Sequence, residues 1–360
     1  LQKIGFEING LKTSPNGRKV ERNMHNIQKR DAQYGLEMAW HKLTKLVDKV
    51  TKELAFPWQI LTAPLFRQTE QGYVQHKASI EGKGWATAIA SDDGLPVGNG
   101  QPFNLDSYSL QTPLDAWQYM EERLNGVDYQ TVSALTTGNR SKFAISNKLV
   151  ELEKIKTADG NEVELIFNFI GSLDKTLPIH LNVSSIRTVC ENTLMMNFLK
   201  TDGFRLRLKH TKNVSEKLEA NKELVEQAVG YSAVVKATFD SLVKQPCSID
   251  RAQRIYTGFL VSDGAEEMST RLGTLVEQHV ECFQRGLGNQ GQNEFDLLNG
   301  FTQLRTRGYA DSKKSAWSTF ESSELGSFAR EKTEFAGLLV ERGKPLAEVE
   351  ARGKALLATA

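Results

Sequence analysis

Residues 129–212 contain a succession of alternating apolar and polar stretches, and this pattern constrains the fold more than any other feature of the sequence. Three of the stretches read YQTVSALTTGNRSKFAIS, NEVELIFNFIGSL and LPIHLNVSS, and a period of two places alternate side chains on opposite faces of a β-strand. The first stretch breaks at Thr-Thr-Gly-Asn, which predicts two strands joined by a turn. Consecutive strands with short connections favour an antiparallel sheet.

Beyond residue 213 the apolar side chains recur at helical spacing instead. SEKLEANKELVEQAVGYSAVVKATFDSLV predicts a long helical region that begins near Val214, and further helices are predicted across 249–284, near 294–305 and in two short C-terminal segments. Residues 306–324 are rich in Ser and Lys and predict a flexible surface loop. A helix is also predicted for IRTVCENTLMMNFL, whose apolar spacing is mixed.

The first third of the chain mixes both patterns. A helix is predicted over residues 34–54, where apolar side chains recur every three or four positions. PWQILTAPLF and GYVQHKASI have strand composition with Pro and Gly at their ends. TPLDAWQYMEERL predicts a short helix with Thr112 as its N-cap residue and Pro113 in its first turn.

Strands gathered first and helices afterwards favour an α+β fold over alternating βαβ units. We predict a central, mostly antiparallel sheet packed by helices, followed by a mainly helical C-terminal half. The chain then divides into a basic, irregular N-terminal segment (1–33), a mixed α/β core (34–212) and a mainly helical region (213–360). Whether the helical region is a separate domain or part of the core domain is left open by the sequence.

Charge and cysteine content describe an ordinary soluble chain. The 45 Lys and Arg residues balance 44 Asp and Glu residues, which excludes a strongly basic DNA-coating protein and an acidic mimic. Cys190, Cys247 and Cys282 are too few for a disulfide framework, and an odd count is typical of a reducing cytoplasm. No apolar run is long enough to cross a membrane, and no signal-peptide pattern is present. We therefore expect a cytoplasmic protein without a membrane partner.

No motif assigns a reaction to the chain. GLGNQG lacks the preceding apolar strand that a phosphate-binding loop needs. His279 and Cys282 share a predicted helix face, but the other ligands of a metal site would have to come from elsewhere. Cys190 lies near Arg187 in an apolar context that is more typical of a buried thiol than of a nucleophile. We predict no catalytic residue, no metal and no cofactor, and a non-enzymatic role is favoured over an enzyme acting through these thiols or a metal.

FRLRLKHTK, residues 204–212, alternates apolar and basic side chains, so a strand here projects a row of cations from one face. Such a row predicts contacts to the backbone of a nucleic acid, which cations bind without regard to sequence. The residues predicted to form this interface, including a Trp-His pair that would stack a base, are Arg187, Arg205, Arg207, Lys209, His210, Lys212, Arg140, Lys142, Trp40 and His41. Further candidates for stacking are Tyr108, Tyr129 and Phe143. The alternative, which the residues alone favour, is a solvated sheet face whose charges serve solubility and protect an edge.

Five segments carry a resemblance to a known family. They read AWHKLT, PWQILTAPLF, VGNGQPFNLDSYSLQTPLDAW, SSIRTVCENTL and RLKHTKN, and order and rough spacing match over about residues 40–310. In these segments the chain resembles the phage- and plasmid-borne proteins catalogued as domain of unknown function 932. RTVCENTL followed by KHT is the most specific part. Lys42 stands where the family usually has glycine, and GSLDKTLP lacks a histidine that the family often carries there.

The resemblance implies a phage, prophage or plasmid protein that acts in a bacterial cytoplasm. Our leading hypothesis is a nucleic-acid-binding protein that anneals single-stranded DNA in recombination without ATP. The link to annealing proteins is an analogy of folds, which is a weak ground for function. Because such proteins work as rings or filaments, a homo-oligomer is expected. The alternative is a factor that binds a host or phage protein, in anti-defence or in a virion, without enzymatic activity.

Overall fold

The structure, a computed structural model, describes residues 7–8, 11–12, 56, 59–70, 72–77, 83–98, 100–126, 128–137, 139–149, 155–187, 193–195, 205–221, 223, 230, 232–261, 267–307 and 316–359. Its strands are β1 (Glu7–Ile8), β2 (Leu11–Lys12), β3 (Ile60–Pro64), β4 (Phe66–Thr69), β5 (Gly72–Gln75), β6 (Trp85–Ala90), β7 (Phe103–Asn104), β8 (Tyr129–Thr136), β9 (Lys142–Leu149), β10 (Ile155–Lys156), β11 (Glu162–Ser172), β12 (Ile179–Arg187), β13 (Thr193–Met195) and β14 (Arg205–Leu208). Its helices are α4 (Pro113–Arg123), α5 (Val214–Glu219), α7 (Ser232–Val243), α8 (Ile249–Leu260), α9 (Thr270–Arg285), α10 (Glu294–Arg307), α11 (Ala316–Glu324), α12 (Ser327–Glu341) and α13 (Gly343–Thr359).

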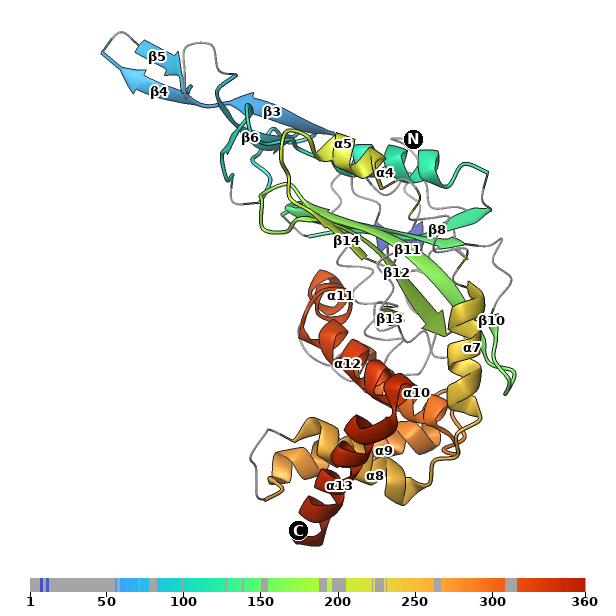
Figure 1. The fold of residues 1–360 in the computed structure, drawn as a ribbon. Coiled ribbons are helices and arrows are strands. Elements are labelled where there is room, and N and C mark those ends of the chain that lie inside the picture. Colours follow the sequence, from blue (N-terminus) through green and yellow to red (C-terminus); the bar gives the residue numbers. More distant parts are fainter. Residues whose placement is uncertain are drawn as a thin grey trace.

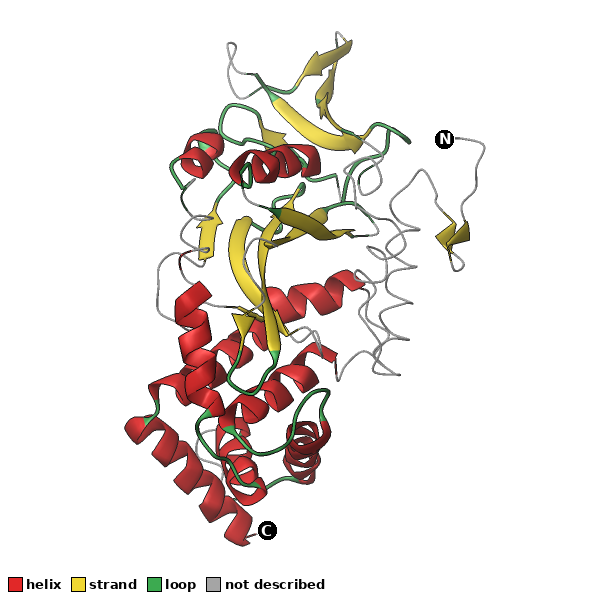
Figure 2. Ribbon diagram, turned by 90° about the vertical axis from the view of Figure 1, so that its right-hand side faces the viewer, coloured by secondary structure: helices red, strands yellow, loops and turns green. Residues whose placement is uncertain are grey.

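A seven-stranded sheet forms the centre of the molecule, in the order β13-β12-β11-β9-β8, with β10 on β11 and β14 on β12. Every pairing is antiparallel, as the alternating pattern predicts. Figure 1 shows α4 and α5 above this sheet and α10, α11 and α12 below it, and Figure 2 shows the same layers from the side. The predicted α+β fold with a helical C-terminal half is confirmed.

Helix α4 begins where the sequence predicts. The Thr112 backbone N–H donates to Asp115 Oδ2 over 2.8 Å, and the Asp115 N–H donates to Thr112 Oγ1 over 3.1 Å. This reciprocal capping box satisfies two N–H groups that the first helical turn leaves without partners. The helix then packs on the sheet through Tyr119, whose ring meets Phe169 edge-on at 5.9 Å between centroids.

Two smaller sheets extend from one end of the central sheet. Strands β3, β6 and β7 form a three-stranded sheet, and β4 pairs with β5 in a hairpin that we call the arm. The arm projects away from the body of the molecule (Figure 1). Separately, β1 pairs with β2 on either side of Asn9-Gly10, one of the two Asn-Gly pairs in the N-terminal segment.

The C-terminal helices have their own aromatic centre. The rings of Phe301 and Phe335 stack at 4.3 Å, and His279 stacks on Phe301 at 4.8 Å. Helices α8 and α13 approach each other most closely at Gly258 and Gly353, where a Cβ atom on either glycine would lie 1.9 Å from a backbone carbonyl oxygen of the opposite helix. Of the helices in the described part of the chain, none is both long and apolar enough to cross a bilayer.

The helix predicted for IRTVCENTLMMNFL is wrong where the structure describes that segment. Residues 193–195 form β13, and Met195 pairs with Ser184. Strand β14 covers β12 only from Ile179 to Asn182, so the remaining part of that edge is available to a second strand. Pairing with β12, the preceding strand, overrides the local helical pattern of this segment.

The helical region predicted after residue 213 contains separate helices, and one further prediction needs correction. Helix α5 lies above the sheet and α7 lies at its far end (Figure 1). Leu218 of α5 accepts a hydrogen bond from Tyr119 of α4, whereas Phe239 of α7 packs on Phe295 of α10, so the two helices serve different parts of the core. Residues 316–324 are not a loop but helix α11, because Trp317 is buried and donates to Glu321 one turn later.

Candidate nucleic-acid interface

Strand β14 lies at an edge of the central sheet and alternates as predicted. Leu206 and Leu208 are half-buried and pack against the hydrophobic core, whereas Arg207 between them is exposed. The backbones of Arg187 and Arg205 lie in β12 and β14, and their side chains are outside the described residues, as are Trp40 and His41. The apolar side of the strand therefore fixes the direction in which its described cation points.

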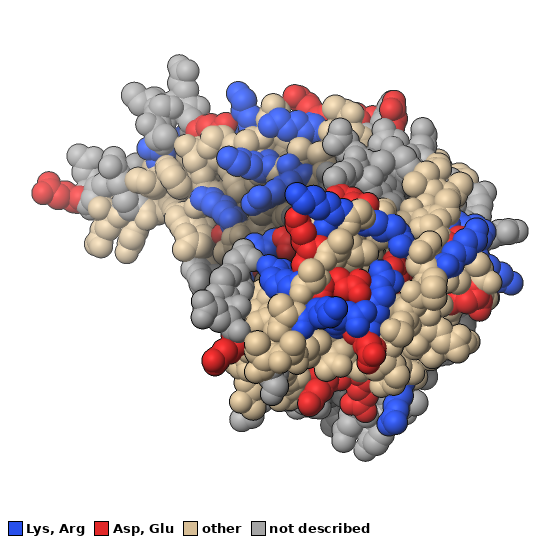
Figure 3. Space-filling view, turned by 60° about the horizontal axis from the view of Figure 1, so that its bottom comes forward, with Lys and Arg blue, Asp and Glu red and all other residues tan. Residues whose placement is uncertain are grey.

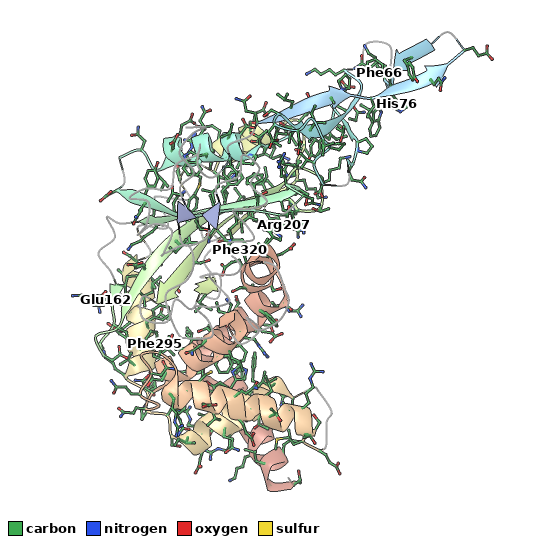
Figure 4. All side chains as sticks on the ribbon, turned by 180° about the vertical axis from the view of Figure 1, so that it is seen from behind. Phe66, His76, Glu162, Arg207, Phe295 and Phe320 are labelled. Carbon is green, nitrogen blue, oxygen red and sulfur yellow. The ribbon has the colours of Figure 1, made fainter. Side chains whose placement is uncertain are left out.

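Arg207 projects toward the side of the sheet where α11 lies. It stands opposite His180 of β12, and directly opposed residues of paired strands share a face. Ser184, four residues further along β12, also shares this face and donates from Oγ to Oε2 of Glu324 in α11 over 2.7 Å. Figure 4 shows Arg207 and Phe320 of α11 on the same side of the sheet. Arg207 is therefore exposed on the side of the sheet on which α11 lies.

Two of the predicted cations are engaged in ion pairs. Arg140 is buried and donates from Nη1 and Nη2 to the two carboxylate oxygens of Asp92 over 2.6 and 2.8 Å. Lys142 pairs with Glu321 of α11 over 2.8 Å. Both side chains therefore hold parts of the fold together, and the structure does not bring them into an exposed cationic row.

Arg207, Lys209 and Lys212, which we call the cationic edge, behave differently. All three are exposed, and none pairs with a carboxylate in the part of the chain that the structure describes. Their backbone is fixed, because Lys212 N–H donates to Ser107 O over 3.1 Å and Thr211 N–H donates to Lys209 O over 2.8 Å. Three cations within six residues, without a carboxylate partner in the described ranges, are thereby presented on a fixed backbone.

His210 does not add to this charge. It is buried and its ring stacks on Tyr108 at 5.3 Å between centroids. Burial lowers the pKa of His210, so its ring is neutral at physiological pH. His210 therefore packs beneath the cationic edge and does not present a charge to a ligand.

Lys175 is a cation that the sequence does not single out. It is exposed, and its Nζ lies 5.6 Å from the ring centre of Tyr108 and 6.0 Å from that of Trp85. The ring of Tyr108 also stacks on His210, so Lys175 and the segment that contains the cationic edge contact the same aromatic ring. Figure 3 shows Lys and Arg side chains gathered around a hollow on the underside of the molecule.

The aromatic side chains predicted to stack on bases are turned inward. Phe143 is fully buried and stacks on Phe169 at 6.1 Å, and Tyr129 is half-buried against the core. Of the Phe, Tyr and Trp rings that the structure describes, Phe66 and Tyr73 on the arm are the exposed ones, with exposed fractions of 57% and 74%. Sequence reasoning missed these rings because a short amphipathic hairpin is expected to bury its apolar face.

The enzymatic alternatives find little support in the geometry. His279 is fully buried among aromatic rings, and burial together with nearby Arg305 lowers its pKa to about 3. Burial raises the pKa of Cys282 to about 11, which disfavours the thiolate. Among the residues that the structure describes, no three His, Cys, Asp or Glu side chains are placed to hold a metal. Cys190 is outside the described residues.

A protein family described as "Domain of unknown function (DUF932)" matches residues 106–325. The chain belongs to this family. The DUF932 match includes the cationic edge and Lys175 and runs to the end of α11, whereas the arm lies before it. No curated protein and no solved structure matches the chain. The DUF932 description names no ligand and no reaction, so membership in the family does not assign a function to the site.

Proposed function

We propose that this protein binds single-stranded nucleic acid through the cationic edge and Lys175, and anneals complementary strands. The observation that carries the proposal is the contrast between paired and unpaired cations. Arg140 and Lys142 have carboxylate partners, whereas Arg207, Lys209 and Lys212 are exposed and have no carboxylate partner among the residues that the structure describes. Phosphate groups are the ligands that such spaced cations bind, and this binding is independent of base sequence.

Annealing follows from holding a strand by its backbone. Cations that bind phosphates leave the Watson–Crick edges of the bases free to pair with a second strand. This mechanism requires no nucleotide hydrolysis and no metal. It also implies several copies along one strand, so we propose a homo-oligomer, acting for a phage or plasmid in a bacterial cytoplasm.

Removal of the cationic edge tests the proposal. The triple variant Arg207→Ala/Lys209→Ala/Lys212→Ala should bind a single-stranded oligonucleotide about ten- to a hundred-fold more weakly, because three exposed cations that contact phosphates are lost. This fold-change corresponds to about 1.4–2.8 kcal/mol in total. The slope of log K against log salt should become shallower by about 2, because each lost phosphate contact on a single strand removes about 0.7. Fluorescence anisotropy of a labelled oligonucleotide measures both quantities.

A control variant removes the same charge elsewhere. Arg271→Ala/Lys344→Ala/Lys354→Ala takes one Arg and two Lys from exposed positions on α9 and α13. Figure 1 shows α9 and α13 at the lower end of the molecule, below the sheet that contains β14. Charges so distant are screened at physiological salt, where the Debye length is about 8 Å. Equal loss of affinity in the two triple variants would refute a specific role for the cationic edge.

A further inference from the structure

The arm exposes two aromatic rings on one face of a two-stranded hairpin. Phe66 pairs with Gln75 and Gln68 pairs with Tyr73, so these four side chains share a face. Phe66 and Tyr73 are diagonal neighbours in this register, a relation that places Cα atoms roughly 7–8 Å apart. Both rings are mostly exposed, at 57% and 74%, and their neighbours on the face are amides rather than apolar side chains. A face of this composition suits flat, polar-edged partners better than an apolar protein surface.

The arm is held in a fixed relation to the three-stranded sheet. Leu65 N–H donates to Trp85 O over 2.8 Å, His76 N–H donates to Leu65 O over 2.7 Å, and Trp85 N–H donates to His76 O over 2.8 Å. These bonds continue the strand pairing of β3 and β6 into the hairpin. The rings are therefore presented by strands and not by a free loop.

A chain of contacts connects the base of the arm with the cationic edge. The exposed ring of His76 lies 6.1 Å from Trp85, and Lys175 Nζ lies 6.0 Å from Trp85 and 5.6 Å from Tyr108. Tyr108 in turn carries His210, which stands between Lys209 and the turn at Lys212. Contacts between aromatic and cationic side chains thus run from His76 at the base of the arm to the buried ring of His210, the sequence neighbour of Lys209.

Lys77 and Lys83 place two exposed cations at the base of the arm, on the segments that leave β5 and enter β6. One carboxylate, that of Asp106, lies beside them and accepts from the Lys83 backbone N–H over 3.0 Å, and Glu70 lies at the tip of the hairpin. Figure 4 labels Phe66 and His76 along the arm, at the opposite end of this track from Arg207. Single-stranded nucleic acid is recognised by this combination of a cationic track and exposed aromatic rings.

We infer that Phe66 and Tyr73 are a base-stacking platform for the single strand whose phosphates bind the cationic edge. The inference rests on the proposed function and adds to it a second, uncharged contribution to binding. Stacking on these rings accepts any base, because every base has a flat π-face. It also orders the strand beyond the cations, where its bases meet a complementary strand.

The double variant Phe66→Ala/Tyr73→Ala separates the two contributions. The probe is an oligothymidylate that carries one 2-aminopurine, whose fluorescence falls when the base stacks. We expect the variant to bind at least tenfold more weakly, to lose the fluorescence change at saturation, and to keep the salt slope of the unmodified protein. Both side chains are exposed, so the variant should fold; Val234→Ala/Ile249→Ala, which removes two exposed apolar side chains from α7 and α8, is the matched control.

The outcomes distinguish this inference from the proposed function. Unchanged affinity and unchanged fluorescence in the arm variant, with the unmodified protein binding in a salt-dependent way, would overturn the stacking platform and leave the cationic edge standing. Absence of binding by the unmodified protein would overturn both. A fall in oligomeric mass measured by sedimentation, without an effect on binding, would overturn the platform and assign the arm to a second copy of the chain.

Discussion

Replacement of Gly258 by alanine is expected to destabilise the protein by about 3 kcal/mol, a cost at the upper end of the usual range for overpacked cores. The added Cβ would lie 1.9 Å from the carbonyl oxygen of Val349 in α13. Helices α8 and α13 would have to separate, because the atom in the way belongs to the backbone and has no rotamer to change. Gly353 is the reciprocal position, with its Cβ 1.9 Å from the carbonyl oxygen of Arg254.

Gly337→Ala is the control for this substitution. Gly337 also lies in a helix, α12, but a Cβ added there meets nothing within 4 Å. It should therefore stabilise the protein by up to about 1 kcal/mol, since alanine favours the helix over glycine by that amount. Urea unfolding midpoints compare the two variants. Equal stability of Gly258→Ala and Gly337→Ala would show that α8 and α13 do not approach as closely as the structure has them.

The second large effect is expected for Arg140→Ala, at about 3 kcal/mol of lost stability. Removing one partner of a buried ion pair typically costs about 3–5 kcal/mol, because the remaining charge loses its partner in a poorly solvated place. Asp92 retains some contact with water, at 20% side-chain exposure, which places the estimate at the lower end. Arg140 also has a φ of 59°, a strained value for a residue with a side chain, and its ion pair helps to hold that conformation.

Lys142→Ala provides the comparison for Arg140→Ala, because Lys142 comes from the same hairpin and pairs with Glu321 in a more exposed setting. Pairs of that kind contribute at most about 1 kcal/mol. Chemical denaturation measures the stability of both variants, and anisotropy at a temperature where both are folded measures binding. Normal stability of Arg140→Ala together with weakened nucleic-acid binding would contradict a structural role for Arg140. It would indicate that Arg140 belongs to the nucleic-acid interface.

Local signals in the sequence predict the elements that depend on neighbours along the chain. Thr112 and Asp115 predict the capping box of α4. The turn residues between two alternating stretches predict the hairpin of β8 and β9. Strand β14 was predicted from the alternation of leucine with arginine and lysine. In each case the residues that determine the structure are within a few positions of one another.

Features that depend on a partner outside their own segment could not be predicted. Asp92 is 48 residues from Arg140, so nothing in the neighbourhood of the arginine indicates that it is already paired. Strand β13 exists because β12 offers it an unpaired edge, which helical spacing does not reveal. Lys175 was assigned to the candidate interface because its Nζ lies over the ring of Tyr108, a residue 67 positions earlier in the chain. The sequence therefore identifies candidate cations for the interface, and the fold shows which of them are exposed to a nucleic acid.

Salt-dependent binding of the unmodified protein to a labelled single-stranded oligonucleotide tests the central claim most directly. The account predicts a dissociation constant in the micromolar range or below at low salt, and a slope of log K against log salt of about −2 or steeper, as expected when three or more phosphates are bound. No binding at low salt would contradict it. The cationic edge would then be a solvated border of the sheet, and a factor that binds another protein would be the better description of this chain.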